Sequence, residues 1–128
     1  MRSLILLVLS LAMFGFSNAL STPTGYTPIA WNPNNQVLLN ILDYGVDQAI
    51  PKAIAAGKLP EGEWAWTTVL GAFYQVVGTG KYFNLVVDIE DGNGYVARLG
   101  VIVLVYPTAS GTAMKLSNWS IVIPAHLA

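Results

Sequence analysis

The segment WAWTTVLGAFYQVVGTGKYFNLVVDIE, residues 64–90, contains two runs of strand-forming residues separated by a short turn. Both runs are rich in β-branched and aromatic residues, which favour a pleated and half-buried surface. Gly78 and Gly80 permit a positive φ at little steric cost, as a tight antiparallel turn requires. The segment therefore predicts a β-hairpin that carries Val76, Val77 and Thr79 into solvent at its tip. Turns are normally polar, so an apolar tip indicates a partner that buries it.

Further extended segments lie on both sides of this hairpin in the sequence. Residues 25–31 form a short extended segment, and Pro28 places it at a sheet edge because proline has no backbone N–H to donate. Residues 91–94, Asp-Gly-Asn-Gly, predict a second hairpin turn before a long strand at residues 95–106. A turn is expected at residues 107–111, followed by a last strand at residues 115–123.

A helix is expected between the first two extended segments. From residue 36 to about residue 50 the small and apolar side chains recur at the spacing of one helical face: Leu38, Ile41, Leu42, Gly45 and Ala49. The asparagines before residue 36 offer an N-cap. Gly45 costs about 1 kcal/mol in helix propensity relative to alanine, which is understandable if a sheet passes close beneath it. Pro51 should end or kink the helix, and residues 53–56 either add another turn or lead into a loop.

The order of these elements is strand, helix and four strands in a meander, without a βαβ unit. This order predicts an α+β domain in which an antiparallel sheet of four to five strands packs on one long helix. In such a meander the turn after the second strand and the turn after the fourth strand lie at the same end of the sheet. The first strand can reach that end as well. Three apolar points at one edge would form a wedge, or each could belong to a separate core contact.

Residues 1–19 are expected to be a signal peptide, and residues 20–128 a single domain. Arg2 precedes an apolar run, and Ser17 and Ala19 are the small residues that a signal peptidase site requires. The alternative is a membrane anchor, but the run is shorter than the roughly 18 to 20 apolar residues that span a bilayer. The protein is therefore expected to be secreted and extracellular, with no membrane association after cleavage.

The composition excludes several functional classes. The net charge is −1 and no basic run occurs, so nucleic-acid binding is not expected. Cysteine is absent, which excludes a disulfide scaffold, a thiol nucleophile and thiolate metal sites. The only histidine, His126, lies in the C-terminal tail, where a rigidly held base is not expected. Asp88, Glu90 and Asp91 are too few and too badly spaced for a calcium loop. No enzyme activity, cofactor or metal is therefore predicted.

The sequence Asn118-Trp119-Ser120 fits the N-glycosylation pattern. The pattern is common by chance, and its position inside an expected strand argues against its use. Asn118 is therefore a candidate glycosylation site only.

Several motifs, in order and spacing, resemble the cystatin family, especially its disulfide-free plant-type members. Residues 25–29, Gly-Tyr-Thr-Pro-Ile, resemble the Gly-Gly-Trp-x-Pro-Ile start, and residues 41–48 resemble the helix motif Leu-Ala-Arg-Phe-Ala-Val-x-Glu. Residues 75–77, Gln-Val-Val, match the start of the Gln-x-Val-x-Gly loop. Residues 103–108 lie where the family has Val-Trp-x-x-Pro-Trp, and residues 116–119 fit its Leu-x-x-Phe. The resemblance covers residues 25 to about 121.

Cystatins inhibit papain-like cysteine proteases without covalent chemistry, by inserting an N-terminal trunk and two hairpin loops into the active-site cleft. The resemblance implies this activity here, with a cathepsin L-type or papain-type enzyme as partner. The residues implied to contact the protease are Gly25, Tyr26, Gln75, Val76, Val77, Gly78, Thr79, Tyr106, Pro107 and Thr108. A monomer is expected, although long strands with apolar hairpin tips permit domain swapping.

Two positions depart from the family pattern. Thr79 stands at the position of the loop glycine, and Thr108 stands where the family has a tryptophan. Because buried aromatic anchors are often worth about 2 kcal/mol or more at an interface, the second change predicts weaker or more selective inhibition. The alternative is a secreted binding or structural module that keeps the fold without protease inhibition. An enzyme of unknown type is the third interpretation.

Overall fold

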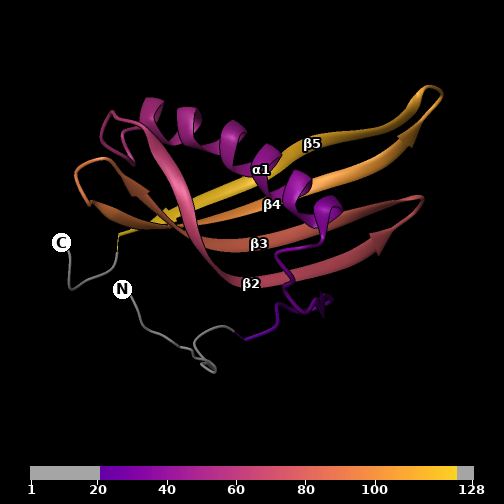
Figure 1. Ribbon diagram of the computed structural model, residues 1–128. Coiled ribbons are helices and arrows are strands. Elements are labelled where there is room, and N and C mark those ends of the chain that lie inside the picture. Colours follow the sequence, from indigo (N-terminus) through magenta and orange to yellow (C-terminus); the bar gives the residue numbers. More distant parts are fainter. Residues whose placement is uncertain (1–20, 124–128) are drawn as a thin grey trace.

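The computed structural model describes residues 21–123, and the expected signal peptide and His126 lie outside these residues. The elements are β1 (Thr27–Pro28), α1 (Gln36–Ala55), β2 (Trp64–Val77), β3 (Gly80–Asp91), β4 (Val96–Thr108) and β5 (Gly111–Val122). All neighbouring strands are antiparallel, in the order β1-β2-β3-β4-β5, and α1 lies across one face of the sheet (Figure 1). The predicted α+β class is confirmed. Within the described range, no helix combines the length and apolarity needed to cross a membrane.

Side-chain and backbone caps set both ends of α1. Asn35 is the N-cap, and its side-chain oxygen accepts a hydrogen bond from the backbone N–H of Leu38 at 3.2 Å. At the other end Gly57 has φ +74°, and its N–H donates to the carbonyl of Ile54 at 3.0 Å. The helix therefore begins where the asparagine run predicts. It ends at Ala55, and the turn that follows contains Gly57, whose positive φ favours glycine.

The helix continues past Pro51 to Ala55, so of the two outcomes left open by the sequence the longer helix is found. Proline in a helix interior costs about 3 kcal/mol because it lacks a donor and crowds the preceding turn. Pro51 is exposed, whereas Ile50 and Ala53 on either side of it are buried against the sheet. Their packing holds the last turn in place.

Gly45 marks the closest approach of α1 to the sheet. A Cβ built on Gly45 would lie 2.9 Å from a methyl carbon of Val101 and 2.9 Å from one of Val103. The expectation that a sheet passes close beneath this glycine is confirmed. The hydroxyl of Tyr44 donates to the carbonyl of Met114 at 3.1 Å, so the same turn of the helix is also tied to β5.

The core lies between α1 and the sheet face that it covers. Alternate residues of β3 and β4 point toward the helix and are fully buried, whereas the residues between them lie on the opposite face. The buried members of these two strands are Leu85, Val87, Ile89, Ala97, Leu99, Val101 and Val103. This alternation is the pattern expected for an antiparallel sheet with one covered face. The opposite side is called the outer face below.

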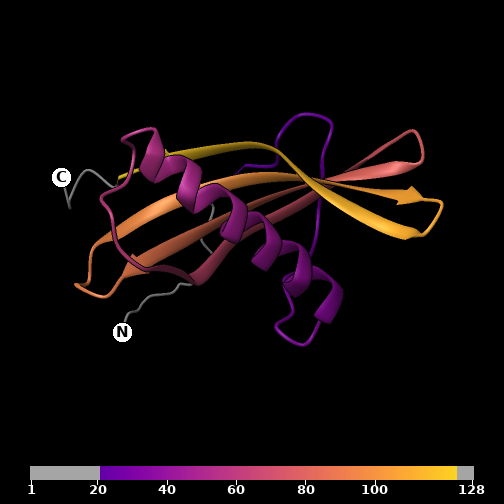
Figure 2. The ribbon, with the colours of Figure 1, turned by 90° about the horizontal axis from the view of Figure 1, so that it is seen from above.

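The strand boundaries differ from the sequence-based expectation mainly at the hairpins. β1 contains only two residues rather than a segment reaching Trp31, and it lies at the sheet edge as Pro28 predicts. β4 extends to Thr108 and β5 begins at Gly111, so the turn is shorter than expected. Figure 2 shows that both long hairpins extend beyond the start of α1. The helix therefore covers the middle of the sheet and leaves their tips free.

Candidate functional site

The three segments singled out by the sequence meet at one end of the sheet. The tips of the β2–β3 and β4–β5 hairpins point in the same direction (Figures 1 and 2). The N-terminal segment joins them, because Thr27 of β1 pairs with Tyr74 of β2. We call this region, residues 25–29, 74–83 and 103–116, the hairpin end. It contains all ten residues that the family resemblance implied for protease contact.

The β2–β3 tip exposes two valines. Val76 is 61% exposed and Val77 is 44% exposed, and Gly78 and Thr79 form the two-residue connection to Gly80. Gly78 has φ +61°, a conformation that residues with a Cβ adopt at a cost. The predicted apolar hairpin tip is therefore present.

Gly80 has a different role from the one expected. Its φ is not positive, so the turn itself does not require glycine there. A Cβ at Gly80 would lie only 2.9 Å from the backbone carbonyl oxygen of Val105. The glycine instead allows β3 to pass close to β4 at the point where the two hairpins meet.

In the β4–β5 tip, the Thr108 hydroxyl is used within the turn. It donates to the carbonyl oxygen of Gly111 at 2.9 Å and lies 3.5 Å from the Ser110 hydroxyl. Pro107 belongs to β4 and pairs with Thr112, rather than opening the turn as expected. It lies beyond the last β3–β4 pair, which is formed by Lys81 and Val105. A proline is tolerated there because β4 has no ladder partner on its β3 side.

The N-terminal segment is held against the first hairpin by Gly25 and Tyr26. Gly25 has φ +86°, and a Cβ there would lie 2.8 Å from the side-chain nitrogen of Gln75. Tyr26 is half-buried, and burial, with a smaller contribution from Tyr82, raises the pKa of its phenol. Gln75 pairs directly with Tyr82 in the β2–β3 ladder. These residues pack together on the outer face and fix the segment beside the tip.

An apolar groove near the hairpin end was missed by sequence reasoning. It has a volume of about 210 Å³ and lies between the start of α1 and the strands. Its lining residues are Ile29, Asn35, Val37, Leu38, Ile41 and Phe83. Val37 is 69% exposed. The sequence does contain an indication of this groove, because Val37 is apolar but lies outside the buried helical face that begins at Leu38.

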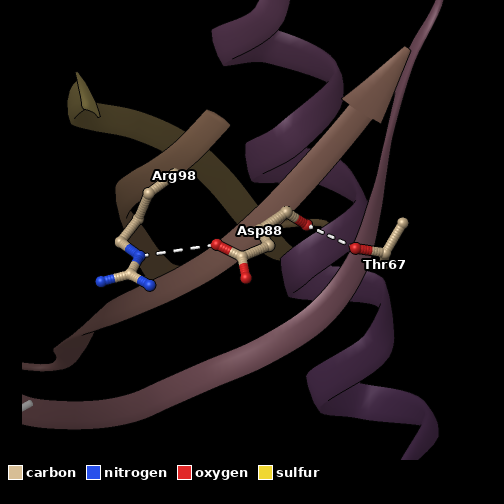
Figure 3. Close-up of polar contacts among 3 residues, drawn as sticks. All are labelled: Thr67, Asp88 and Arg98. Atoms are coloured by element: carbon tan, nitrogen blue, oxygen red, sulfur yellow. Dashed lines mark hydrogen bonds and ion pairs between the residues drawn. The ribbon is translucent and has the colours of Figure 1, made fainter. Parts of the chain in front are cut away.

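The carboxylates considered for a cation site have other partners and lie away from the hairpin end. Asp88 is 3.5 Å from the Nε of Arg98, and its backbone carbonyl accepts a hydrogen bond from the Thr67 hydroxyl (Figure 3). Burial raises the pKa of Asp88, and Arg98 opposes that rise. Asp91 accepts from the N–H groups of Asn93 and Tyr95. Among the described residues no group of three metal-ligating side chains occurs.

Asn118 lies in β5, as expected, and away from the two hairpin tips. Its side chain is exposed, and its oxygen accepts from the backbone N–H of Trp119 at 2.9 Å. β5 contains a β-bulge next to Asn118: Ile102 pairs with Asn118 and Val103 pairs with Leu116, so Ser117 has no partner in β4. The sequon is therefore accessible on an edge strand but belongs to a different surface from the hairpin end.

Comparisons of the chain with protein-family models, with curated proteins and with solved structures each gave no match. The site is therefore interpreted from its own geometry. It exposes two valines at the β2–β3 tip, and the ranges that form the hairpin end contain no histidine, cysteine or carboxylate. Such a surface is suited to binding another protein.

Proposed function

We propose that this protein is a secreted, reversible and non-covalent inhibitor of papain-like cysteine proteases with a cystatin-like fold. The hairpin end would enter the active-site cleft, with Val76 and Val77 in the centre, the N-terminal segment on one side and Pro107 on the other. The proposed inhibitor carries out no chemistry of its own. It uses no cofactor or metal and acts as a monomer.

One observation carries the proposal: three segments far apart in the sequence bring apolar residues to one exposed edge. The exposed Val76, Val77 and Pro107 and the half-buried Tyr26 and Tyr106 lie at this edge, and apolar residues grouped at one place indicate a binding surface. The edge is narrow because it is formed by the tips of antiparallel strands. A narrow projecting edge fits a cleft better than a flat surface.

We also expect the hairpin end to be preorganised, and three local features support this expectation. The Thr108 hydroxyl donates a hydrogen bond across the β4–β5 turn. Gly78 lets the β2–β3 turn adopt a positive φ without steric strain. Gly25 packs closely against the Gln75 side chain. Preorganised loops lose little conformational entropy on docking, so more of the interaction energy remains for affinity. A wedge of this kind excludes substrate while placing no scissile peptide bond in register with the catalytic cysteine.

The test is a titration against papain and a cathepsin L-type enzyme with a fluorogenic peptide substrate. The full 128-residue chain is expressed in a secreting eukaryotic host and recovered from the medium, where N-terminal sequencing also tests cleavage after Ala19. Reversible inhibition at nanomolar to low micromolar concentration is expected. Failure of the folded protein to inhibit either enzyme at high micromolar concentration contradicts the proposal.

A matched pair of variants locates the inhibitory surface. Val76→Asp places a charge at the hairpin tip, whereas Val122→Asp places the same charge on a valine of almost equal exposure, 59%, near the end of β5. Loss of a buried apolar contact predicts weakening by about thirtyfold or more for Val76→Asp. Val122→Asp should inhibit like the wild type. Equal effects of both changes would place the binding surface elsewhere.

A second candidate function is a binding or structural module without protease inhibition. The hydrogen bond from Thr108 to Gly111 favours it, because Thr108 serves the turn where the family has a tryptophan, and Tyr106 beside it is only partly exposed. The double change Thr79→Gly and Thr108→Trp separates the two candidates. An inhibitor with weakened loops should gain affinity for papain, whereas a module with another partner should show little change.

A further inference from the structure

The charged residues of the protein are divided between two regions of the sheet. All seven carboxylates lie outside the hairpin end: Asp43, Asp47, Glu61, Glu63, Asp88, Glu90 and Asp91. The hairpin end contains only two charged side chains, Lys81 and Lys115. The remainder of the described chain has three basic residues against seven acidic ones. Among the described residues, the hairpin end is therefore positive and the remainder is negative.

The two lysines flank the hairpin end on opposite faces of the sheet. Lys81 pairs with Val105, and its ammonium nitrogen lies 5.5 Å from the ring centroid of Tyr74. Because side chains alternate along a strand, Lys81 shares the helix side with Phe83, which packs against the core. Lys115 pairs with Leu104 on the outer face. A wedge with one cation on each face would bring a lysine to each rim of a cleft that it entered.

We infer that the partner of the hairpin end is a papain-type protease whose apolar cleft carries carboxylates along both rims. This inference rests on the proposed function and specifies which members of that protease class the protein binds fastest. The two lysines attract the acidic rims, and the acidic remainder of the molecule is repelled by them. The protein therefore approaches such a cleft with its hairpin end first.

The expected effect is on the rate of association. Exposed ion pairs contribute little to equilibrium stability because water and salt screen them. Charges at the rim of an interface instead steer the encounter, and steering weakens as the screening length falls with added salt. The association rate should therefore depend on ionic strength, while the dissociation rate stays nearly constant.

The experiment measures association and dissociation rates from inhibition progress curves at NaCl concentrations between about 20 mM and about 300 mM. Two papain-type proteases are compared, one with carboxylates on its cleft rims and one with neutral or basic rims. The double variant Lys81→Gln, Lys115→Gln removes both hairpin-end charges. The control Lys52→Gln, Lys58→Gln removes two exposed charges from the other end of the molecule.

With the acidic-rimmed enzyme at low salt, the first double variant should associate roughly three- to tenfold more slowly than the wild type. Its salt dependence should be shallower, and the control pair should change the rate by less than about twofold. Lys81→Arg should keep the wild-type rate, because arginine retains the charge and can stack on Tyr74. Circular dichroism checks that each variant is folded.

Two results overturn the inference and can be told apart. If both proteases are inhibited but neither salt nor the lysine changes alter the association rate, the steering inference is wrong and the inhibitor function stands. If neither protease is inhibited, the proposed function is wrong and this inference is lost with it.

Discussion

Both ends of the sheet contain tight hairpin turns with a glycine at positive φ, but the surfaces around these turns differ. At the hairpin end Gly78, with φ +61°, turns β2 into β3, and Val76 and Val77 beside it are exposed. At the other end Gly94, with φ +82°, helps to turn β3 into β4, but the turn is polar and Asp91 closes it with two hydrogen bonds. Tyr95 beside this turn is also 48% exposed, but its ring lies 6.3 Å from the ring of Trp64, measured between centroids. A tight turn in this protein therefore does not require a pair of exposed valines, which fits the binding role proposed for Val76 and Val77.

The largest expected effect comes from a change in the core, which should destabilise both ends of the sheet together. Gly45→Leu forces a side chain into a space where even a Cβ would lie 2.9 Å from Val101 and Val103. Overpacking of this kind should lower the free energy of unfolding by about 3 kcal/mol. Urea denaturation followed by tryptophan fluorescence measures the loss. The control Gly92→Ala meets no atom within 4 Å and should change stability little. A stable Gly45→Leu variant would contradict the close approach of helix and sheet.

The next change affects the polar end alone. Asp91→Ala removes the acceptor of two hydrogen bonds, at 2.9 Å from Asn93 and 2.8 Å from Tyr95. A loss of about 1 to 2 kcal/mol in the free energy of unfolding is expected. Protease inhibition should be unchanged, because this turn lies opposite the hairpin end. Asp91→Asn keeps an acceptor oxygen and should restore most of the stability. Weaker inhibition by a folded Asp91→Ala protein would show that the two ends are not independent.

A smaller change affects the hairpin end alone. Thr108→Val keeps the side-chain shape but removes the hydroxyl that donates to Gly111. We expect a loss of about 1 kcal/mol in unfolding free energy and weaker protease inhibition, because the tip is less rigid. Equilibrium unfolding and the inhibition constant measure these two effects. Thr68→Val is the matched control, since the exposed Thr68 lies in β2 outside the hairpin end. Identical behaviour of the two variants would rule out a role for the Thr108 hydrogen bond.

The smallest effect lies between the two ends, at Asp88. Burial raises the pKa of this carboxyl, so folding disfavours its ionised form. The resulting loss of stability is present above the folded pKa and is relieved as the pH falls through it toward the unfolded value. The wild type should therefore gain stability relative to Asp88→Asn as the pH is lowered from 7 to below the ordinary range of Asp. Unfolding curves at several pH values test this trend. A constant or opposite difference would show that the Arg98 pair outweighs burial.

Much of the fold follows from local patterns in the chain. Alternating apolar residues in β3 and β4 identify a sheet with one covered face, and Asn35 and Gly57 mark the ends of the helix. The small residue at Gly45 correctly predicts close packing. Pro51 was harder to interpret, because its local cost is offset by the tertiary packing of Ile50 and Ala53, which no window of sequence contains.

The candidate site was predictable in its parts but less so in its details. The meander order places the two hairpin tips at one end whatever their residues are. The use of Gly80 for close strand passage, and of the Thr108 hydroxyl within its turn, depends on atoms from a neighbouring strand or across the turn. The exposed Val37 and its groove went unnoticed for a similar reason, since the groove is formed only when α1 meets β3.

The sequence by itself determined the order of the elements, the face of each strand that is buried and the absence of thiol chemistry. These properties depend on side-chain periodicity and residue type, which are local. Only the tertiary structure decided that α1 continues past Pro51, that Gly80 serves strand contact and that Lys81 and Lys115 lie on opposite faces of one end. These properties depend on which strands are neighbours and on their register, and the sequence of a single strand does not specify either.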